Sequence, residues 1–406
     1  MHEFKKIIER ELALGPDLSI INLIDQLIRH ASSLGASDIH IDPQEKLVRV
    51  RFRVDGVLED LYTLPKAIHP EIISRIKVLS GLRTDEHNAA QDGRFRSIIS
   101  DSGSVDIRVS IVPTYHGENT VLRLLSDRAE SFTLETLGFS ASDQNKILQA
   151  LIRQNGMILV TGPTGSGKTT TLYTLIKMLN SKDISIITIE DPIEYAVEGV
   201  EQIQVNPRTG LSFANGLRSI LRQDPNVIMV GEIRDTETAG IAVNTALTGH
   251  LLLSTLHTND AATTLPRLLD MKIESFLVAS TVSIAIGQRL VRKICKGCKE
   301  KKTLTKEEQK RLAEVLPADM LKNNRGFFYG RGCAACNGTG YRRRLVIAEV
   351  LVASENVKKA ILRKAPAREI KELAGSEGMS SMLADGLQKA LQGETTIEEV
   401  LRVTHE

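Results

Sequence analysis

One complete phosphate-binding motif limits what this chain can fold into. Residues 162–169 read Gly-Pro-Thr-Gly-Ser-Gly-Lys-Thr, which satisfies GxxxxGK(S/T) at every position. The apolar run 158–160 ahead of it predicts a buried strand, and residues 170–176 behind it predict a helix. A glycine-rich turn at a helix N-terminus directs backbone N–H groups at phosphate. A chance match is the alternative reading, but the motif stands between the strand and helix that it requires.

The residues of this motif have separate expected roles in binding ATP and Mg²⁺. Lys168 is expected to reach the β- and γ-phosphates, and the Thr169 hydroxyl is expected to ligate Mg²⁺. The other nucleotide-binding positions are expected at Gly162, Pro163, Thr164, Gly165, Ser166, Gly167 and Thr170. The sequence therefore predicts a P-loop nucleotide site.

Length and composition describe a globular protein of two or three domains. The chain has 406 residues, a net charge of +2 and 42% hydrophobic residues, so bulk charge favours neither nucleic acid nor membrane. Aromatic residues make up only 4%, which disfavours base-stacking platforms. No apolar stretch approaches the roughly 20 residues that span a bilayer, and Met1–Lys6 is too charged to open a secretion signal. We expect a cytoplasmic protein.

The first part of the chain has the pattern of an α+β domain. Apolar residues recur at helical spacing over 20–34, which predicts a helix capped by Asp17 and stopped by Gly35. Two runs of period two, at 48–54 and 105–111, predict strands of a mainly antiparallel sheet. A helix is expected between them at 71–82. We assign residues 1–125 to this domain and residues 126–136, which are polar, to a linker.

The chain then alternates strands and helices, as in a doubly wound α/β core of the RecA-like P-loop class. Apolar strands are expected at 157–161, 184–189, 227–230 and 251–255, and polar residues follow each of them. Ligands of such sheets bind beyond the carboxyl ends of the strands. We assign residues 137–292 to this core.

Acidic residues after two of these strands are candidates for ATP hydrolysis. Glu232 follows an apolar strand in the manner of a Walker B acid, although Gly231 stands where many P-loop proteins carry Asp. It is the first choice for general base. Glu190, Asp191 and Glu194 form a second acidic cluster that can share this role, or can instead cap helices or face solvent.

A histidine and two arginines complete the candidate catalytic set. His257, at the end of its strand, is either a γ-phosphate sensor or a structural histidine. Arg94 and Arg108 lie on or beside strands of the first domain. Either is part of a solvated face or an arginine finger, which contributes roughly 10³ to 10⁵ in rate when a neighbour supplies it.

The cysteines form two CxxC pairs, Cys295 with Cys298 and Cys333 with Cys336. Two such pairs can close a tetrahedral Cys₄ zinc site, which is structural because no position stays open. Disulfide or redox use is the alternative. We assign residues 293–345, with a helix at 306–316, to a zinc-binding subdomain, and residues 346–406 to a helical C-terminal cap.

Several stretches together resemble the secretion ATPase superfamily, and within it the type II secretion and type IV pilus assembly (extension) ATPases. The similarity covers nearly the whole chain in the family's order. The stretches are Ala36-Ser-Asp-Ile-His-Ile41, Gln91-Asp-Gly-Arg94, the loop 162–169, Ile189-Glu-Asp-Pro-Ile-Glu194, Leu221-Arg-Gln-Asp-Pro225, Val230-Gly-Glu-Ile-Arg-Asp235, Thr248-Gly-His250, Thr255-Leu-His257-Thr-Asn-Asp260 and the CxxC pairs.

The resemblance implies a hexameric ATPase, peripheral to the cytoplasmic face of the inner membrane, that moves an inner-membrane platform protein of a pilus or secretion machine. It implies an Asp box at 190–194, a Walker B glutamate at Glu232 and a His box at His250 and His257. Arg94 and Arg108 match the arginines that the family presents to a neighbour's phosphates. Further arginines matched with less support are Arg218, Arg222 and Arg234. By the same resemblance the chain begins near the family's second N-terminal domain, and the preceding docking domain is not expected in it.

Two other classes of function share parts of this pattern. A hexameric nucleic-acid translocase or DNA-uptake motor has the same core fold, but it needs a basic groove with aromatic residues, and the sequence marks none. A small-molecule kinase needs an acceptor-binding lid, and none is recognisable. We therefore expect ATP hydrolysis for mechanical work, with no nucleic-acid partner.

Overall fold

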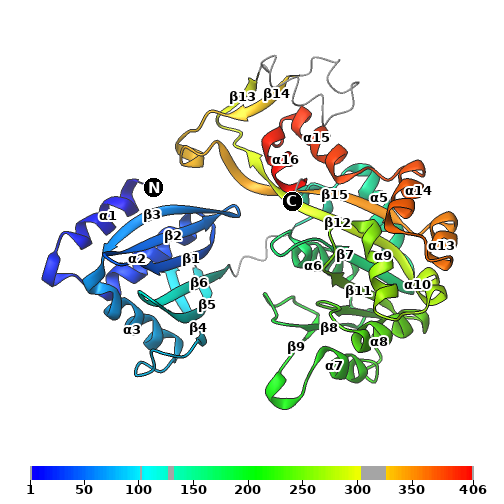
Figure 1. The fold of residues 1–406 in the computed structure, drawn as a ribbon, viewed down its shortest axis with the longest axis horizontal. Helices are drawn as coiled ribbons and strands as arrows, with labels where there is room; N and C mark the ends of the chain where they lie inside the picture. The colour runs from blue at the N-terminus through cyan, green and yellow to red at the C-terminus, as the bar shows by residue number, and fades with distance from the viewer. Residues whose placement is uncertain (1, 101–102, 127–131, 303–325, 405–406) are drawn as a thin grey trace. The chain divides into compact units, whose positions relative to one another are not determined.

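The computed structural model describes residues 2–100, 103–126, 132–302 and 326–404. The chain forms two compact units, residues 1–130 and 131–406 (Figure 1). The predicted linker at 126–136 lies partly outside the described residues, and helix α4 (Leu134–Leu137) already begins within it. The finer division of the chain made from sequence stays a prediction.

The first unit is an antiparallel sheet with helices on one face. In its described part six strands follow the order β3-β2-β1-β6-β5-β4. The strands are β1 (Ala36–Pro43), β2 (Leu47–Val54), β3 (Val57–Pro65), β4 (Gln91–Ser100), β5 (Gly103–Thr114) and β6 (Gly117–Ser126). The helices are α1 (His2–Leu12), η1 (Gly15–Asp17), α2 (Ile20–Ser33), η2 (Lys66–Ile68) and α3 (His69–Ser80).

The alternation of side chains separates the two faces of this sheet. Apolar residues of every second position, such as Val50 and Ile107, are buried with the helices α1 to α3 in one core. Several of the intervening positions, among them Arg49, Arg96 and Asp106, carry charge on the opposite face. Arg94 lies opposite Arg108 in the register of β4 and β5, and Arg108 lies opposite Arg123 in that of β5 and β6. The register therefore places three arginines in one row across neighbouring strands.

Local details of this unit differ from expectation at one helix end. The hydroxyl of Ser19 caps α2 by accepting a hydrogen bond from the Asn22 N–H at 3.3 Å, so the prediction of Asp17 as the cap is wrong. Asp17 instead belongs to η1. The helix expected at 71–82 is α3 and begins two residues earlier. Gly35, with φ of +66°, follows α2 as predicted.

The second unit is built on one mixed sheet. Within its described part seven strands follow the order β15-β12-β7-β11-β10-β8-β9. All neighbours are parallel except β12 and β15. The strands are β7 (Gly156–Thr161), β8 (Ile186–Glu190), β9 (Glu201–Gln204), β10 (Val227–Val230), β11 (Leu251–Leu256), β12 (Val282–Ile294) and β15 (Tyr341–Val352). β15 crosses the boundary at 345/346 that the sequence suggests between zinc subdomain and cap.

Helices cover both faces of this sheet (Figure 1). One core joins the sheet to α4, α5 (Ala141–Leu151) and α6 (Lys168–Leu179). A second core joins the other face to α7 (Phe213–Ile220), α8 (Thr236–Leu247), α9 (Ala261–Asp270), α10 (Ser275–Thr281), α13 (Glu355–Leu362) and α14 (Ala367–Ser376). The strands are apolar throughout because both of their faces are buried.

The cysteine segment and the last helices extend from β12 and β15. A small ribbon pairs β13 (Lys299–Lys302) with β14 (Phe327–Gly330), and the turns η3 (Pro207–Thr209) and η4 (Ala334–Cys336) complete the unit. The helices α15 (Met382–Gln392) and α16 (Ile397–Thr404) pack on the outer part of β12 and β15. The helix expected at 306–316 lies outside the described residues. In the parts that the structure describes, no helix has the length and apolar character to cross a bilayer.

Candidate functional site

The glycine-rich loop 162–167, which the motif predicts to bind phosphate and which is called the phosphate-binding loop below, joins β7 to α6. Gly162, Gly165 and Gly167 have φ values of +146°, +78° and +87°, which favour glycine. Gly162 also has no room for a side chain, because a Cβ would lie 2.5 Å from the carbonyl oxygen of Gln288. The glycines of the motif are therefore required by backbone conformation and by close packing.

Lys168 is the first residue of α6 and is largely buried. Its ammonium donates hydrogen bonds to the carbonyls of Gly162 at 2.9 Å and Pro163 at 3.0 Å. Burial lowers the pKa of Lys168, the Glu232 carboxylate opposes this shift, and the Arg289 guanidinium adds to it. The Lys168 ammonium is thus close enough to both Glu232 and Arg289 to interact with them electrostatically.

Parallel neighbours bring the polar strand ends to one edge of the sheet. β11 lies between β7 and β10, and β10 pairs with β8. At this edge the Thr161 hydroxyl donates to the carbonyl of Leu256 at 2.9 Å and accepts from the Thr258 N–H at 3.0 Å. The loop that carries His257 is thereby tied to the start of the phosphate-binding loop.

Glu232 follows β10 at this edge, with its side chain 14% exposed. One carboxylate oxygen pairs with Arg234, and the other lies 3.1 Å from Nε2 of His257. Burial raises the pKa of the Glu232 carboxyl, but the hydrogen bonds and charges of Arg234 and His257 outweigh it and hold the pKa below its ordinary value. Glu232 is therefore ionised at neutral pH and able to accept a proton.

Glu190 ends β8 and is almost completely buried, with 3% of its surface exposed. Its carboxylate accepts hydrogen bonds from the hydroxyls of Tyr173 and Thr188 and from Nε2 of Gln202, the last two at 2.6 and 3.1 Å. Tyr173, on α6, is itself fully buried. Glu190 thus joins the helix of the phosphate-binding loop to β8 and β9.

Replacing Tyr173 with phenylalanine is expected to lower the free energy of unfolding by about 1–3 kcal/mol, because a buried carboxylate loses one donor. Chemical denaturation measures the change. Tyr195→Phe is the matched control, since the Tyr195 ring packs edge-to-face on Tyr173 at 4.7 Å and its hydroxyl has no hydrogen bond to the described residues. Equal free energies of unfolding in the two variants would show that the hydrogen bond from Tyr173 to Glu190 does not contribute to stability.

The other predicted site residues lie at different places in the fold and do not form one cluster with Glu232 and His257 in the described part of the chain. Asp191 is exposed, and Glu194 is half-buried, with its N–H directed at the Tyr173 hydroxyl at 3.4 Å. His250 precedes β11 and His257 follows it. Because a strand rises about 3.3 Å per residue, the two histidines lie about 20 Å apart, at opposite ends of β11. On α7, Arg218 pairs with Glu237 at 2.6 Å, and Arg222, two residues past the end of that helix, donates to the Arg218 carbonyl at 2.9 Å. Arg94 and Arg108 lie in the first unit, in the row described above.

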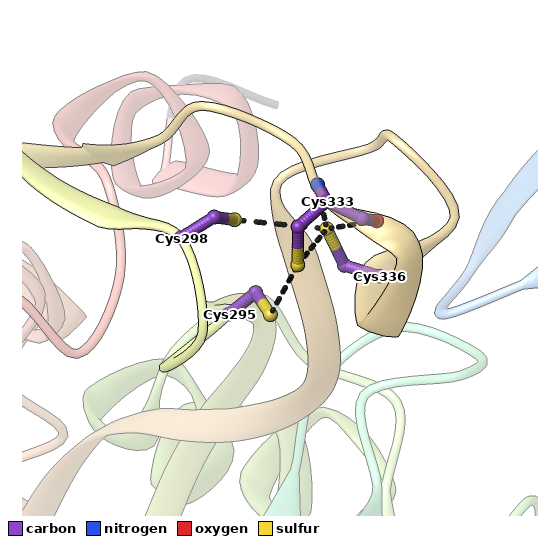
Figure 2. Close-up of side chains that lie close together, drawn as sticks. All are labelled: Cys295, Cys298, Cys333 and Cys336. Atoms are coloured by element: carbon purple, nitrogen blue, oxygen red, sulfur yellow. Dashed lines mark hydrogen bonds between the residues drawn. The ribbon is translucent and has the colours of Figure 1, made fainter.

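The four cysteine side chains point toward one another, two from the end of β12 and two from the η4 turn (Figure 2). The sulfur atoms of Cys295 and Cys333 lie 3.8 Å apart, and those of Cys298 and Cys336 lie 3.7 Å apart. Four sulfurs placed about 2.3 Å from one metal in a tetrahedron are separated by about 3.8 Å. A disulfide requires about 2.05 Å. The four free thiols therefore fit a tetrahedral metal site.

Backbone donors reinforce this cluster at Cys336. The N–H groups of Cys333 and Gly340 donate to its sulfur at 3.2 and 3.3 Å. Burial raises the pKa of the Cys336 thiol, but these donors and the neighbouring cysteines outweigh it and lower the pKa to about 6. The Cys336 thiolate, the form that ligates metals, is therefore favoured, whereas burial and the hydrogen bonds with the other cysteines raise the pKa of Cys298 to about 12.

Two further residues at the phosphate-binding loop belong to no sequence motif identified above. Gln288 and Arg289 lie on β12, and both side chains contact the loops of the site. The signal that marks them is a polar pair between the apolar residues 284–286 and 290–291 of a strand that belongs to a sheet buried on both faces.

A family model described as "Type II/IV secretion system protein" matches residues 15–402. The chain belongs to this family. Among its secretion-system relatives, the type II secretion system protein E of Xanthomonas campestris is 47% identical over 97% of this chain and 69% of its own length. The type IV pilus assembly ATPase PilB of Pseudomonas aeruginosa is 43% identical, with the same coverage. The resemblance seen in the sequence motifs is confirmed.

Solved structures of the secretion family have the same fold. The pilus retraction motor PilT with bound ADP is 28% identical, with a TM-score of 0.63 over 94% of this chain and 97% of that one. The ATPase DotB of Legionella pneumophila has a TM-score of 0.68 at 24% identity, over 94% of this chain and 95% of that one. The predicted fold class is therefore confirmed.

Proposed function

We propose that this chain is an ATPase that converts ATP hydrolysis into mechanical work for type IV pilus assembly or type II protein secretion. One observation carries the proposal. Lys168, which belongs to a complete GxxxxGK(S/T) motif, lies at the same edge of the sheet as Glu232 and His257. The names of the relatives, a type II secretion protein E and a pilus assembly ATPase, support the cellular role.

The loop residues bind and orient the nucleotide. The backbone N–H groups of 164–168, which lead into the N-terminus of α6, hold the phosphates, and Lys168 supplies positive charge against the β- and γ-phosphates. The hydroxyl of Thr169, which is exposed at the helix start, would hold Mg²⁺. Bound there, Mg²⁺ neutralises charge on the phosphate oxygens.

Glu232 is the general base in this proposal. Its carboxylate is ionised and partly exposed at the sheet edge beside Lys168, so it can take a proton from an attacking water, whereas Glu190 is almost completely buried and accepts hydrogen bonds from three donors inside the unit. Glu190 then positions α6 and β8 around the site. His257, half-exposed and 3.1 Å from Glu232, senses the γ-phosphate through that carboxylate.

The arginines of the first unit act on a neighbouring subunit in a hexamer. The row containing Arg94 and Arg108 concentrates positive charge on the open face of the sheet. Arg123 in the same row pairs with Asp38 at 3.0 Å, and the charge of Arg94 and Arg108 suits the phosphates of a neighbouring subunit's nucleotide.

Zinc and membrane partners complete the proposal. The cysteine cluster holds Zn²⁺ as a structural ion, because four thiolates leave no open position. The motor acts on an inner-membrane platform protein and stays peripheral to the cytoplasmic face of that membrane.

The test is ATPase activity against protein concentration, with particle mass measured in parallel. Specific activity is expected to rise as hexamers form. Arg94→Ala is expected to lower turnover in the hexamer by about 10- to 100-fold, less than the 10³ or more of a sole arginine finger, because Arg108 still supplies charge.

Arg49→Ala is the matched control, since Arg49 lies on the same open face but on β2, separated from β4 by three strands. Its turnover should equal that of wild type. A fully active monomer, indifferent to Arg94, would contradict the ring motor. Stimulation of turnover by DNA would instead favour a nucleic-acid translocase.

A further inference from the structure

The phosphate-binding loop packs against the middle of β12, a strand outside the motif. Gly162 approaches the carbonyl oxygen of Gln288, and an added Cβ at Gly167 would lie 3.3 Å from Gln288 Nε2. The Gln288 side chain is fully buried. A buried amide is costly unless its donors and acceptor are paired, so its partners identify what it holds.

Both ends of the Gln288 amide are bound to the loop and its helix. Nε2 donates to the carbonyl of Ser166 at 2.8 Å, and Oε1 accepts from the hydroxyl of Thr171 at 2.9 Å. Ser166 stands before Gly167, and Thr171 lies in the first turn of α6. One side chain therefore spans the junction where the loop becomes a helix.

This contact sets the direction of a backbone donor. In a planar trans peptide the C=O and the following N–H point in opposite directions. Because Gln288 draws the Ser166 carbonyl toward β12, the Gly167 N–H is directed away from β12. Gly167, with φ of +87°, lacks a side chain and can adopt many backbone conformations. It therefore does not by itself fix the orientation of the Ser166–Gly167 peptide.

The next residue of β12 holds the second loop of the site. Arg289 is largely buried and donates to the carbonyls of Gln288 at 3.1 Å and Asn259 at 2.9 Å. Asn259 lies two residues after His257. β12 thus sets the positions of the phosphate-binding loop and of the loop that carries His257.

We propose that Gln288 is a positioning residue for nucleotide binding: its amide fixes the Ser166–Gly167 peptide so that the Gly167 N–H is presented to a phosphate oxygen. The inference rests on the proposed ATP binding and adds to it a residue that contacts no nucleotide itself.

The experiment measures the ADP dissociation constant of the full chain by titration calorimetry, together with kcat and KM for ATP. Gln288→Met keeps the length of the side chain and removes both hydrogen bonds. We expect ADP binding to weaken about tenfold, which corresponds to about 1.4 kcal/mol. KM should rise in parallel while kcat changes by less than about threefold, since the amide binds substrate and transition state alike.

Val291→Ala is the matched control because Val291 is buried on the same strand, in the core formed with α15 and α16. It should lower the melting temperature and leave ADP affinity within about twofold of wild type. Equal weakening of ADP by both variants, or unchanged affinity in Gln288→Met, overturns the proposal.

A second pair of variants guards against misfolding of Gln288→Met. Thr171→Val removes the hydroxyl that holds Oε1 and should weaken ADP about threefold, and Thr171→Ser should restore the affinity. Unchanged affinity in Thr171→Val counts against the proposal. A wild-type chain that binds no ADP would overturn the proposed ATPase itself, whereas normal wild-type binding with unaffected variants overturns only the role of Gln288.

Discussion

Glu232→Gln is expected to reduce ATP turnover by about 10³-fold while ATP and ADP still bind. General bases contribute about 10² to 10⁴ in rate, and glutamine preserves the shape of the side chain but accepts no proton. Glu232 is the carboxylate at the sheet edge that acts on Lys168 and has a lowered pKa. Steady-state turnover and calorimetric binding of ADP separate the two effects.

Glu237→Gln provides the control for this variant. Glu237 is exposed in the first turn of α8, five residues further along, and pairs with Arg218 on the surface. Its loss should leave turnover unchanged, since surface ion pairs are weak. If Glu232→Gln keeps full turnover and Glu190→Gln loses it, the base is Glu190 and its buried hydrogen bonds must open during the reaction.

The strand–loop–helix geometry around residues 162–169 was predictable because its sequence signal is local. Backbone amides at a helix start need glycines, one lysine and one hydroxyl at fixed spacing, and all of these lie within 162–169. The parallel strands were also predictable, since strands buried on both faces are continuously apolar. The structure places β7, β10 and β11 within one residue of the expected bounds at each end.

Elements that depend on distant pairing were harder to predict. β15 pairs with β12 across the whole cysteine segment, so no local period shows that both belong to the main sheet. The cap of α2 illustrates a smaller ambiguity. Asp17 and Ser19 are both good capping residues, and only the η1 turn decides in favour of Ser19.

Some residues of the candidate site could likewise be predicted from the sequence, and others could not. Glu232 and His257 follow apolar strands, so their meeting at one edge could be inferred from the chain order. The burial of Glu190 could not, because it depends on Tyr173 and Gln202 from other elements. Gln288 escapes motif reasoning for the same reason: its partners lie more than a hundred residues earlier in the chain.

Cys333→Ser is expected to abolish zinc binding and to lower the free energy of unfolding by at least about 3 kcal/mol. Structural zinc contributes about 10–16 kcal/mol in small peptides, and part of this is lost when one of four thiolates is missing. The cluster joins the end of β12 to the segment before β15, where the Cys295 N–H also donates to the Gly340 carbonyl at 2.9 Å. Elemental analysis and chemical denaturation measure both effects.

Ala335→Ser is the matched control, because it adds a hydroxyl between Cys333 and Cys336 and leaves all four thiols in place. It should keep one zinc per chain and wild-type stability. A strong chelator should destabilise the wild type to the level of Cys333→Ser and leave that variant unchanged. If a reductant rather than a chelator destabilises the wild type, the cysteines form disulfides and the zinc site is wrong. The sulfur separations of 3.7–3.8 Å match the edge length of a zinc–thiolate tetrahedron. We therefore expect the chelator, and not the reductant, to destabilise the wild type.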